Sequence, residues 1–395
     1  MRKINLLYFS YFVSIVALFV YSFTQVDLSL TLTRASIWKP IQNYVQHIGY
    51  FQRPLSTAIF LIIISLLFII YALFLRLSYL EKLNRKKIWI LIILGAVLLV
   101  FSYNAFSYDM FNYIFDAKII THYHLNPYVY KPLDFPHDPM LSFMHWVQVP
   151  SRYGPAWFLL TAPLSFLGFN FFLPTFFLFK GLASVCFLGS AFLIEKISQK
   201  IPNRKSLFAL VVFAFNPLVI IESLVSSHND TEMMFFALLG IYFVINKKTY
   251  SPLISTVFSA LIKFVTGVLA IPILFYLLSG KFTKQKQSIE GFLKTTLLFM
   301  TAAFFFILTR MEVQPWYFLW ILPFIALQKF NKYLIIFSFG VSLGLILRYS
   351  EYLYLGHWNN FFPSPRDYLT LLTIGIFIVL MIILRFKSSL FPKHS

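Results

Sequence analysis

Long apolar segments alternate with short polar loops along the whole chain, and this alternation is the strongest pattern in the sequence. Several of the apolar runs exceed about 18 residues, the length at which a segment is expected to cross a bilayer as a helix. The pattern predicts spanning helices over 4–23, 54–78, 88–105, 172–194, 206–226, 232–246, 251–265, 266–280, 291–309, 316–329, 333–347 and 369–386. We therefore expect an all-α polytopic membrane protein with about twelve transmembrane helices.

Two segments need a separate interpretation. The run 156–168 is apolar but short and contains Pro163, so it predicts a re-entrant or interfacial helix rather than a crossing. The run 251–280 has basic residues on both flanks, which predicts two short crossings broken near Gly267.

The composition agrees with a membrane protein and explains the charge. Hydrophobic residues make up 59% of the chain and charged residues 12%, about half the share in a soluble domain. The net charge is +19, and basic residues form clusters at 82–87, 196–205, 247–248, 281–286 and 329–332. Because such clusters stay in the cytoplasm, both termini are expected there and no nucleic-acid partner is needed. The loops 24–53, 106–155, 227–231, 310–315 and 348–367 then face the other side.

No flexible linker or internal repeat divides the chain, which predicts one integral domain over 1–395. Within it we distinguish N-terminal helices (1–87), a central module (88–330) and C-terminal helices (331–395). The single cysteine, Cys186, excludes an intramolecular disulfide. The sequence has no phosphate loop, no His-Glu-x-x-His, no nucleophile elbow and no Cys/His metal spacing. An ATPase, a zinc protease or a serine hydrolase is therefore disfavoured, and we expect no metal and no cofactor.

The stretch SYDMFNYIFDAKIITHYHLNPY (107–128) directly follows an apolar run and contains two carboxylates. Asp109 and Asp116 are seven residues apart, so a helix places both on one face. Their aromatic neighbours predict an amphipathic helix on the membrane surface, where an acid can act as a general base or bind sugar hydroxyls. Asn126 and Tyr128 lie in an Asn-Pro turn, and the tyrosine fits either sugar stacking or an interfacial aromatic belt.

Two further loops carry polar residues suited to a head group. In PSRYGPAW (150–157), Arg152 and Tyr153 precede the short helix, either as an ordinary helix entry or with Arg152 binding a phosphate. In SLVSSHNDTEMM (223–234), His228, Asn229 and Asp230 satisfy a tight turn and also fit a polyhydroxyl or anionic ligand.

Lysines within apolar runs indicate function, because a charge at membrane depth needs a cavity or a partner. Lys263 is a candidate substrate ligand, with snorkelling to the surface as the alternative. Lys180 is expected to pair with a carboxylate. Arg310 and Gln314 occupy a short outer turn, and the aromatic segment 348–367 is either a lid or an interfacial belt.

The blocks YDMFNYIFDAK, NPY, SRYGPAW, FNP…SSHNDTEMM, ALIKF…AIPILFYLL and QPWYFLW occur in this order over 88–330. In this respect the chain resembles polyprenyl-phosphate-dependent glycosyltransferases of the GT-C fold, including mannosyltransferase-like families and the GPI mannosyltransferase. The resemblance implies Asp109 as catalytic base, inversion at the anomeric carbon and a polyprenyl-phosphate-linked hexose, such as mannose, as donor. It implies a glycan or glycolipid acceptor, contact with membrane lipids, and the plasma membrane of a prokaryote. The sequence lacks the acidic pair common in the family, which leaves the role of Asp116 open.

A secondary transporter or a flippase for a lipid-linked sugar is the alternative, because broken helices and an intramembrane lysine also occur in transporters. Against it, the polar residues concentrate in the outer loops and no inverted repeat is visible.

Overall fold

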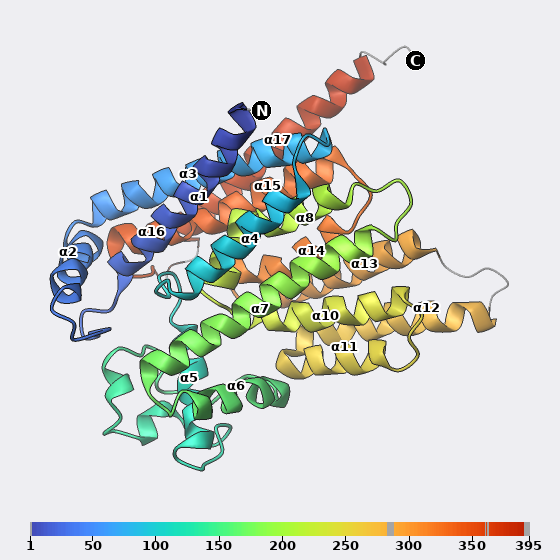
Figure 1. Cartoon of the computed structure of the whole chain (residues 1–395). Coiled ribbons are helices and arrows are strands. Elements are labelled where there is room, and N and C mark those ends of the chain that lie inside the picture. The colour runs from blue at the N-terminus through green and yellow to red at the C-terminus, as the bar shows by residue number, and fades with distance from the viewer. Residues whose placement is uncertain (1, 283–287, 360, 362, 391–395) are drawn as a thin grey trace.

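The computed structural model describes residues 2–282, 288–359, 361 and 363–390, and within them the chain is helical with no strand. Long helices form a tilted bundle, and shorter helices close one of its ends (Figure 1). The longest are α1 (Arg2–Ser22), α3 (Arg53–Tyr79), α7 (Phe172–Ser198), α13 (Ile289–Leu308), α15 (Lys332–Leu347) and α17 (Pro365–Leu390).

Among the described residues, six helices are long and apolar enough to cross a membrane, or seven if one bent pair counts as a span. The bent pair consists of α8 (Ser206–Ala214) and α9 (Pro217–Ile220) with the π-helix Ile221–Val225, bent by 56°. Apolar side chains on α3 and α17, such as Ile62 and Leu372, are exposed and require lipid to cover them. The protein is therefore an all-α membrane protein, while the number of crossings stays a prediction.

The remaining apolar segments form shorter helices packed among the long ones. They are α4 (Arg85–Val100), α10 (Asp230–Ile245), α11 (Ser251–Ile262), α12 (Ala270–Phe282) and α14 (Leu322–Ala326), with 3₁₀-helices η5 (Phe264–Leu269) and η6 (Pro315–Trp320). Two helices are thus present over 251–280 as expected. The α-helix ends at Lys263, however, rather than near Gly267, because the chain there becomes extended (φ −153°, ψ 122°) and continues as η5.

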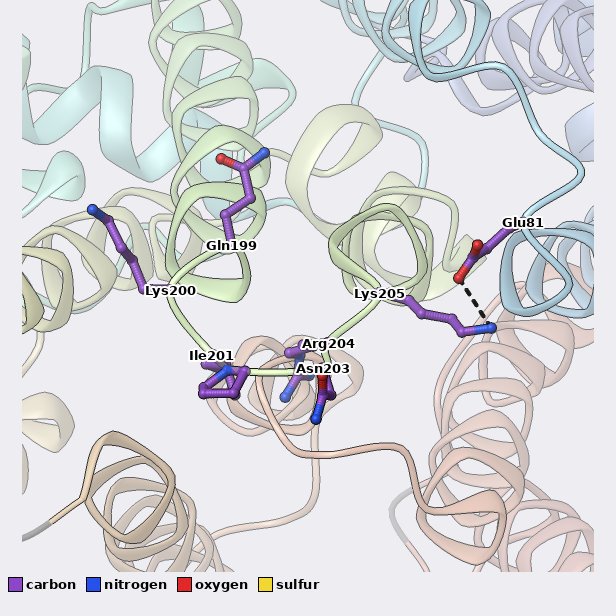
Figure 2. A pocket seen from close by; sticks show the side chains of 8 residues that line it. Glu81, Gln199, Lys200, Ile201, Asn203, Arg204 and Lys205 are labelled. Atoms are coloured by element: carbon purple, nitrogen blue, oxygen red, sulfur yellow. Dashed lines mark ion pairs between the residues drawn. The ribbon is translucent and has the colours of Figure 1, made fainter.

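The basic loops gather at one end of the bundle. Figure 1 shows the start of α1, the end of α17, the α3–α4 turn and the α7–α8 loop at this end. Lys205 in the α7–α8 loop binds Glu81 in the α3–α4 turn at 3.1 Å, which Figure 2 shows beside an open hollow of about 740 Å³. Arg204 donates to the carbonyls of Ala326 and Leu327. The predicted cluster members Lys284 and Lys286 lie outside the described residues.

The opposite end of the bundle carries α2 (Trp38–Phe51), α5 (Asp109–Thr121), α6 (Pro155–Leu167) and α16 (Tyr349–Leu355) (Figure 1). We expected α5 to lie on the membrane surface, but ten of its residues, Met110 to Ile119, are buried. The reason is packing, because α6, α7 and the loop that follows α5 enclose it; Phe111, for example, packs against Phe143 and Phe172. The short α6 with Pro163 is a helix, and its re-entrant placement stays a prediction.

Candidate active site

Asp109 opens α5 and projects into a cavity of about 300 Å³ at the end of the bundle opposite the basic loops. Its backbone N–H donates to the Ser107 hydroxyl, which fixes the start of the helix. Its side chain is 23% exposed, so the carboxylate is accessible from the cavity. Asp109 therefore places an accessible carboxylate at the start of a helix.

The imidazole of His228 lies between two carboxyl groups. Its Nδ1 is 3.5 Å from Oδ2 of Asp109, and its Nε2 is 3.3 Å from Oε2 of Glu222. Both distances are longer than an ordinary N–H···O hydrogen bond, and neither ring nitrogen nor Oε2 of Glu222 has a hydrogen-bond partner in the structure. Trp316 stacks on the ring with centroids 3.9 Å apart. The hydroxyl of Tyr349 in turn donates to Oε1 of Glu222 at 2.9 Å.

Aromatic rings and two arginines line the rest of the cavity. The rings belong to Phe106, Tyr108, Trp146, Trp316, Tyr349, Tyr352 and Trp358. Their planar faces suit the apolar face of a sugar ring. Arg348 and Arg366 both donate to Oε1 of Glu312, at 2.6 and 3.0 Å, and Arg348 also binds Asp367 at 2.8 Å. The guanidinium groups of Arg348 and Arg366 thus both bind the same carboxylate oxygen of Glu312 at the cavity wall.

The same arginines line a second, larger cavity of about 620 Å³ between α13 and α17. Leu308, Val313, Phe361 and Leu371 contribute its apolar wall. Because α13 and α17 are both candidate spans by length and composition, we expect lipid beside this cavity and call it the lipid-facing cavity. Arg348, Arg366 and Glu312 line both cavities and therefore mark their junction.

Asp230 and Lys263 form a pair beside this site. Asp230 is buried, and both of its oxygens are 3.0 Å from the Lys263 ammonium group. The indole N–H of Trp320 donates to the same carboxylate at 2.5 Å. Asp230 is the first residue of α10, and its side chain points to Lys263. The Lys263 side chain stays 29% exposed, so a ligand can still reach it.

Asn229, Tyr113 and Tyr153 connect these groups to the loop before α6. The Tyr113 hydroxyl donates to Oδ1 of Asn229 at 3.4 Å, and the Tyr153 ring packs edge-on against Tyr113 at 4.9 Å. Burial and the nearby carboxylates of Asp109, Asp116 and Asp230 raise the pKa of Tyr153 well above its ordinary value. Asp109, Asp116 and Asp230 are therefore all near this one tyrosine.

Asp116 is buried two turns along α5 from Asp109 and faces Ser151 rather than the cavity. Burial raises its pKa from 3.8 to about 7, with a small opposing effect of the Ser151 hydrogen bond. The Asn126 side chain accepts from the backbone N–H of Tyr128 at 2.9 Å, and the Tyr128 hydroxyl donates to the Tyr153 carbonyl at 3.0 Å. Asn126 and Tyr128 thus shape the loops beside Asp116.

Arg152, Arg310 and Gln314 occupy different surroundings. Arg152 is exposed, with no hydrogen bond or ion pair among the described residues. Arg310 is exposed at the lipid-facing cavity and lies over the Phe306 ring at 5.3 Å. Gln314 lines the cavity that contains Asp109. Of these three expected ligands, only Gln314 therefore shares the Asp109 cavity.

Several residues of this site did not emerge as candidates from the sequence. Glu222 lies inside an apolar run, the same signal that singled out Lys263, and could have been found by it. Arg348 and Arg366 belong to the aromatic segment that was interpreted as a lid or a belt. Trp316 and Tyr349 gave no signal, because aromatic residues are common throughout this chain.

Lys180 does not pair with a carboxylate, as we had expected. Its ammonium group donates to the Ser102 hydroxyl at 3.0 Å and to the carbonyls of Leu224 and Val225 at 2.5 and 2.8 Å. The irregular backbone at the end of the π-helix Ile221–Val225 leaves these carbonyls free to accept. Lys180 therefore anchors the segment that leads to His228.

Among the described residues, no three His, Cys, Asp or Glu side chains converge on a point that a metal ion could occupy. Asp109, His228 and Glu222 lie in a row instead, with the imidazole between the carboxyl groups.

Comparison with known proteins agrees with the sequence resemblance. Comparisons with curated proteins and with solved structures gave no significant match. Residues 14–280 match the model of the MptA/B family, described as alpha-(1->6)-mannopyranosyltransferase, N-terminal domain. This match covers more than half of the chain and includes Asp109, His228 and Lys263. The chain therefore belongs to this GT-C-type mannosyltransferase family.

Proposed function

We propose that this mannosyltransferase takes mannose from a polyprenyl-phosphate donor and attaches it to an acceptor hydroxyl, with Asp109 as the general base. The observation that carries the proposal concerns the carboxylates of the Asp109 cavity. Asp109 and Glu312 are the acids that line it among the described residues, and Glu312 is neutralised by two arginines. Asp109 is the carboxylate left to accept a proton.

In the proposed reaction, Asp109 removes the proton of the acceptor hydroxyl while that oxygen attacks the anomeric carbon of mannose. The bond from this carbon to the phosphate oxygen breaks, and the polyprenyl phosphate leaves with the electron pair. A single base and direct displacement predict inversion at the anomeric carbon. For this reaction, the mannose must lie in the Asp109 cavity, among the aromatic rings, and the phosphate must lie at the edge of that cavity.

The arginines at the junction of the two cavities are the best placed cations for that phosphate. Guanidinium groups bind phosphate oxygens in pairs and stabilise the negative charge that develops on the leaving group. The lipid-facing cavity beside them offers an apolar path for the polyprenyl chain. Arg348 and Arg366 thus replace Arg152 and Arg310 in this role, and Lys263 remains a further ligand for hydroxyl or phosphate groups.

The distribution of charge supports the non-cytoplasmic side for the reaction. Basic loops favour the cytoplasm, and in the structure the α3–α4 and α7–α8 loops lie together at the end opposite α5 and α6 (Figure 1). With that orientation, both termini lie inside and the Asp109 cavity opens on the outer side, at the depth of the lipid head groups.

The test is Asp109→Asn in purified protein supplied with polyprenyl-phosphate-mannose and a mannoside acceptor. We expect turnover to fall by about 10²- to 10⁴-fold, the usual contribution of a positioned base, with an unchanged melting temperature. Asp134→Asn is the control, because Asp134 is an exposed acid of the loop after α5. An Asp109→Asn enzyme with near-normal turnover would show that another group is the base. A wild-type enzyme that uses only a nucleotide-linked mannose would refute the proposed donor.

A further inference from the structure

Behind Asp109 lies a buried pair of side chains, Glu222 and His228, to which the proposed reaction assigns no role. Glu222 and the His228 ring are fully buried, and the three contacts from Asp109 to Tyr349 measure 3.5, 3.3 and 2.9 Å. Tyr349 is 127 residues from Glu222 in the sequence. The tertiary fold therefore brings together the row Asp109–His228–Glu222–Tyr349. Asp109 is its most exposed member.

The backbone holds His228 and Glu222 on the same side of their segment. The π-helix Ile221–Val225 ends with the N–H of Ser226 donating to the carbonyl of Ile221 at 2.7 Å. The N–H of His228 then donates back to the carbonyl of Glu222 at 2.9 Å, and Ser227 adopts a positive φ of 47° to allow it. A positive φ is costly for serine, which indicates that the surrounding contacts impose this turn.

Two neighbouring side chains hold this turn in place. Lys180 binds the carbonyls of Leu224 and Val225, and Trp316 covers the face of the imidazole. The ring therefore has little freedom to rotate away from the two carboxyl groups. π-helical turns are frequently found at functional sites, which agrees with a role for this one.

The direction of the hydrogen bonds in the row determines which ring nitrogen of His228 carries the proton. Tyr349 donates to Oε1 of Glu222, so Oε2 is the atom that meets His228. A neutral imidazole carries one N–H. If Glu222 holds a proton on Oε2 and donates it to Nε2, the imidazole proton must reside on Nδ1, where it points at Asp109. Every member then has a partner, and the row runs in one direction from Tyr349 to Asp109.

We propose that Glu222 is a positioning residue that holds His228 in the Nδ1–H tautomer, so that His228 donates to Asp109 and orients its carboxylate. This inference rests on the proposed function, since it assigns Asp109 the role of base. His228 contacts Asp109 directly, whereas Glu222 acts only through His228. Contacts of 3.3 to 3.5 Å at a catalytic group commonly shorten in the complex with substrate.

The geometry also predicts which substitutions preserve the row. In Glu222→Gln, the Tyr349 hydroxyl selects the amide oxygen for the Oε1 position, which leaves the amide NH₂ facing Nε2 of His228. Glutamine can therefore donate as protonated glutamate does. Glu222→Met removes both the donor and the acceptor at similar length. The matched control is Glu232→Met, since Glu232 is also a buried glutamate, with Oε2 unpartnered, only ten residues further on.

The experiment measures kcat and the donor KM for the three variants, together with ¹⁵N spectra of histidine-labelled protein assigned with His228→Gln. We expect Glu222→Met to lower kcat by about 10- to 100-fold, less than loss of the base itself, with a donor KM within about twofold. Glu222→Gln and Glu232→Met should keep kcat close to the wild-type value. The spectra should show Nδ1–H in the wild type and in Glu222→Gln, and a mixture in Glu222→Met.

Several results would overturn the inference. It fails if Glu222→Met keeps full kcat, or if Glu222→Gln is as damaged as Glu222→Met. It also fails if the wild-type spectrum, assigned with His228→Gln, shows His228 protonated on Nε2, a result that does not depend on the activity of any variant. If the wild type transfers nothing from polyprenyl-phosphate-mannose, the proposed function fails instead, and the spectra still decide the tautomer.

Discussion

Gly154 is the position where one added methyl group should disturb the site most directly. Its backbone N–H donates to the carbonyl of Ile262 at 3.1 Å, which docks the loop before α6 onto the end of α11. A Cβ built on Gly154 would lie 2.0 Å from the carbonyl oxygen of Leu261. The backbone angles of Gly154 (φ −72°, ψ 166°) suit any residue, so the expected effect of Gly154→Ala is purely steric.

The size of the effect follows from that distance. Ordinary contact begins at 3.4 Å, so the loop must retreat by about 1.4 Å from a backbone that cannot move easily. This retreat breaks the hydrogen bond to Ile262, and together overpacking and the lost bond should cost about 2–4 kcal/mol. The loop carries Tyr153, which packs against Tyr113 beside Asn229. Because a 1 Å misplacement can lower a rate by about 100-fold, transfer should fall by at least tenfold.

Thermal unfolding in detergent and mannosyl transfer, measured on the same preparations, test this prediction. Gly181→Ala is the control, because Gly181 lies in α7 with nothing within 4 Å of an added Cβ. Alanine there should leave activity unchanged and stabilise the helix by about 0.5–1 kcal/mol. If Gly154→Ala has the melting temperature and the transfer rate of the wild type, the loop before α6 does not pack on α11 as described. The placement of Tyr153 is then wrong as well.

Two other perturbations follow from buried polar groups. Lys180→Met leaves the carbonyl of Val225 without its donor and that of Leu224 with only the Ser227 hydroxyl, so we expect a loss of about 2–3 kcal/mol in thermal unfolding and a lower transfer rate. A more stable variant would mean that the cost of burying the ammonium group exceeds the gain from its hydrogen bonds. Asp116 binds its proton more tightly in the folded state, since burial raises its pKa from 3.8 to about 7. Its contribution to stability should therefore decline as the pH rises from about 4 to about 7 and be lost above that. Asp116→Asn should raise the melting temperature at pH 8 but not at pH 4, and equal melting temperatures at pH 8 would contradict this.

The helices were largely predictable from the sequence because membrane spans are a property of composition. Each apolar run that we assigned coincides with at least one helix, and the short run with Pro163 became the helix α6. The ends of helices were less predictable. The break at Lys263, for instance, depends on its pairing with Asp230, a residue 33 positions earlier.

The candidate site was predictable where one residue type stood out locally, and not where distant segments meet. Asp109 and the turn at His228 stood out because polar residues followed apolar runs. The stacking of Trp316 on His228 and the bond from Tyr349 to Glu222 join segments about 90 and 127 residues apart, and no local pattern encodes them. Arg152 is prominent in the sequence and has no partner among the described residues, so its role as a phosphate ligand stays a prediction.

Irregular backbone links these observations to the lipid environment. In hydrocarbon, a helix cannot leave backbone groups unpaired, so breaks persist only where protein or a water-filled cavity satisfies them. The π-helix Ile221–Val225 depends on Lys180 for its carbonyls, and the break at Lys263 depends on Asp230 and the close approach of Gly154. Each break also delivers a site residue, His228 in the first case and Lys263 in the second. The helix breaks and the chemistry therefore share one cause, because both need polar partners where lipid is excluded. A substitution that restores a regular helix at either break should therefore abolish activity before it unfolds the protein.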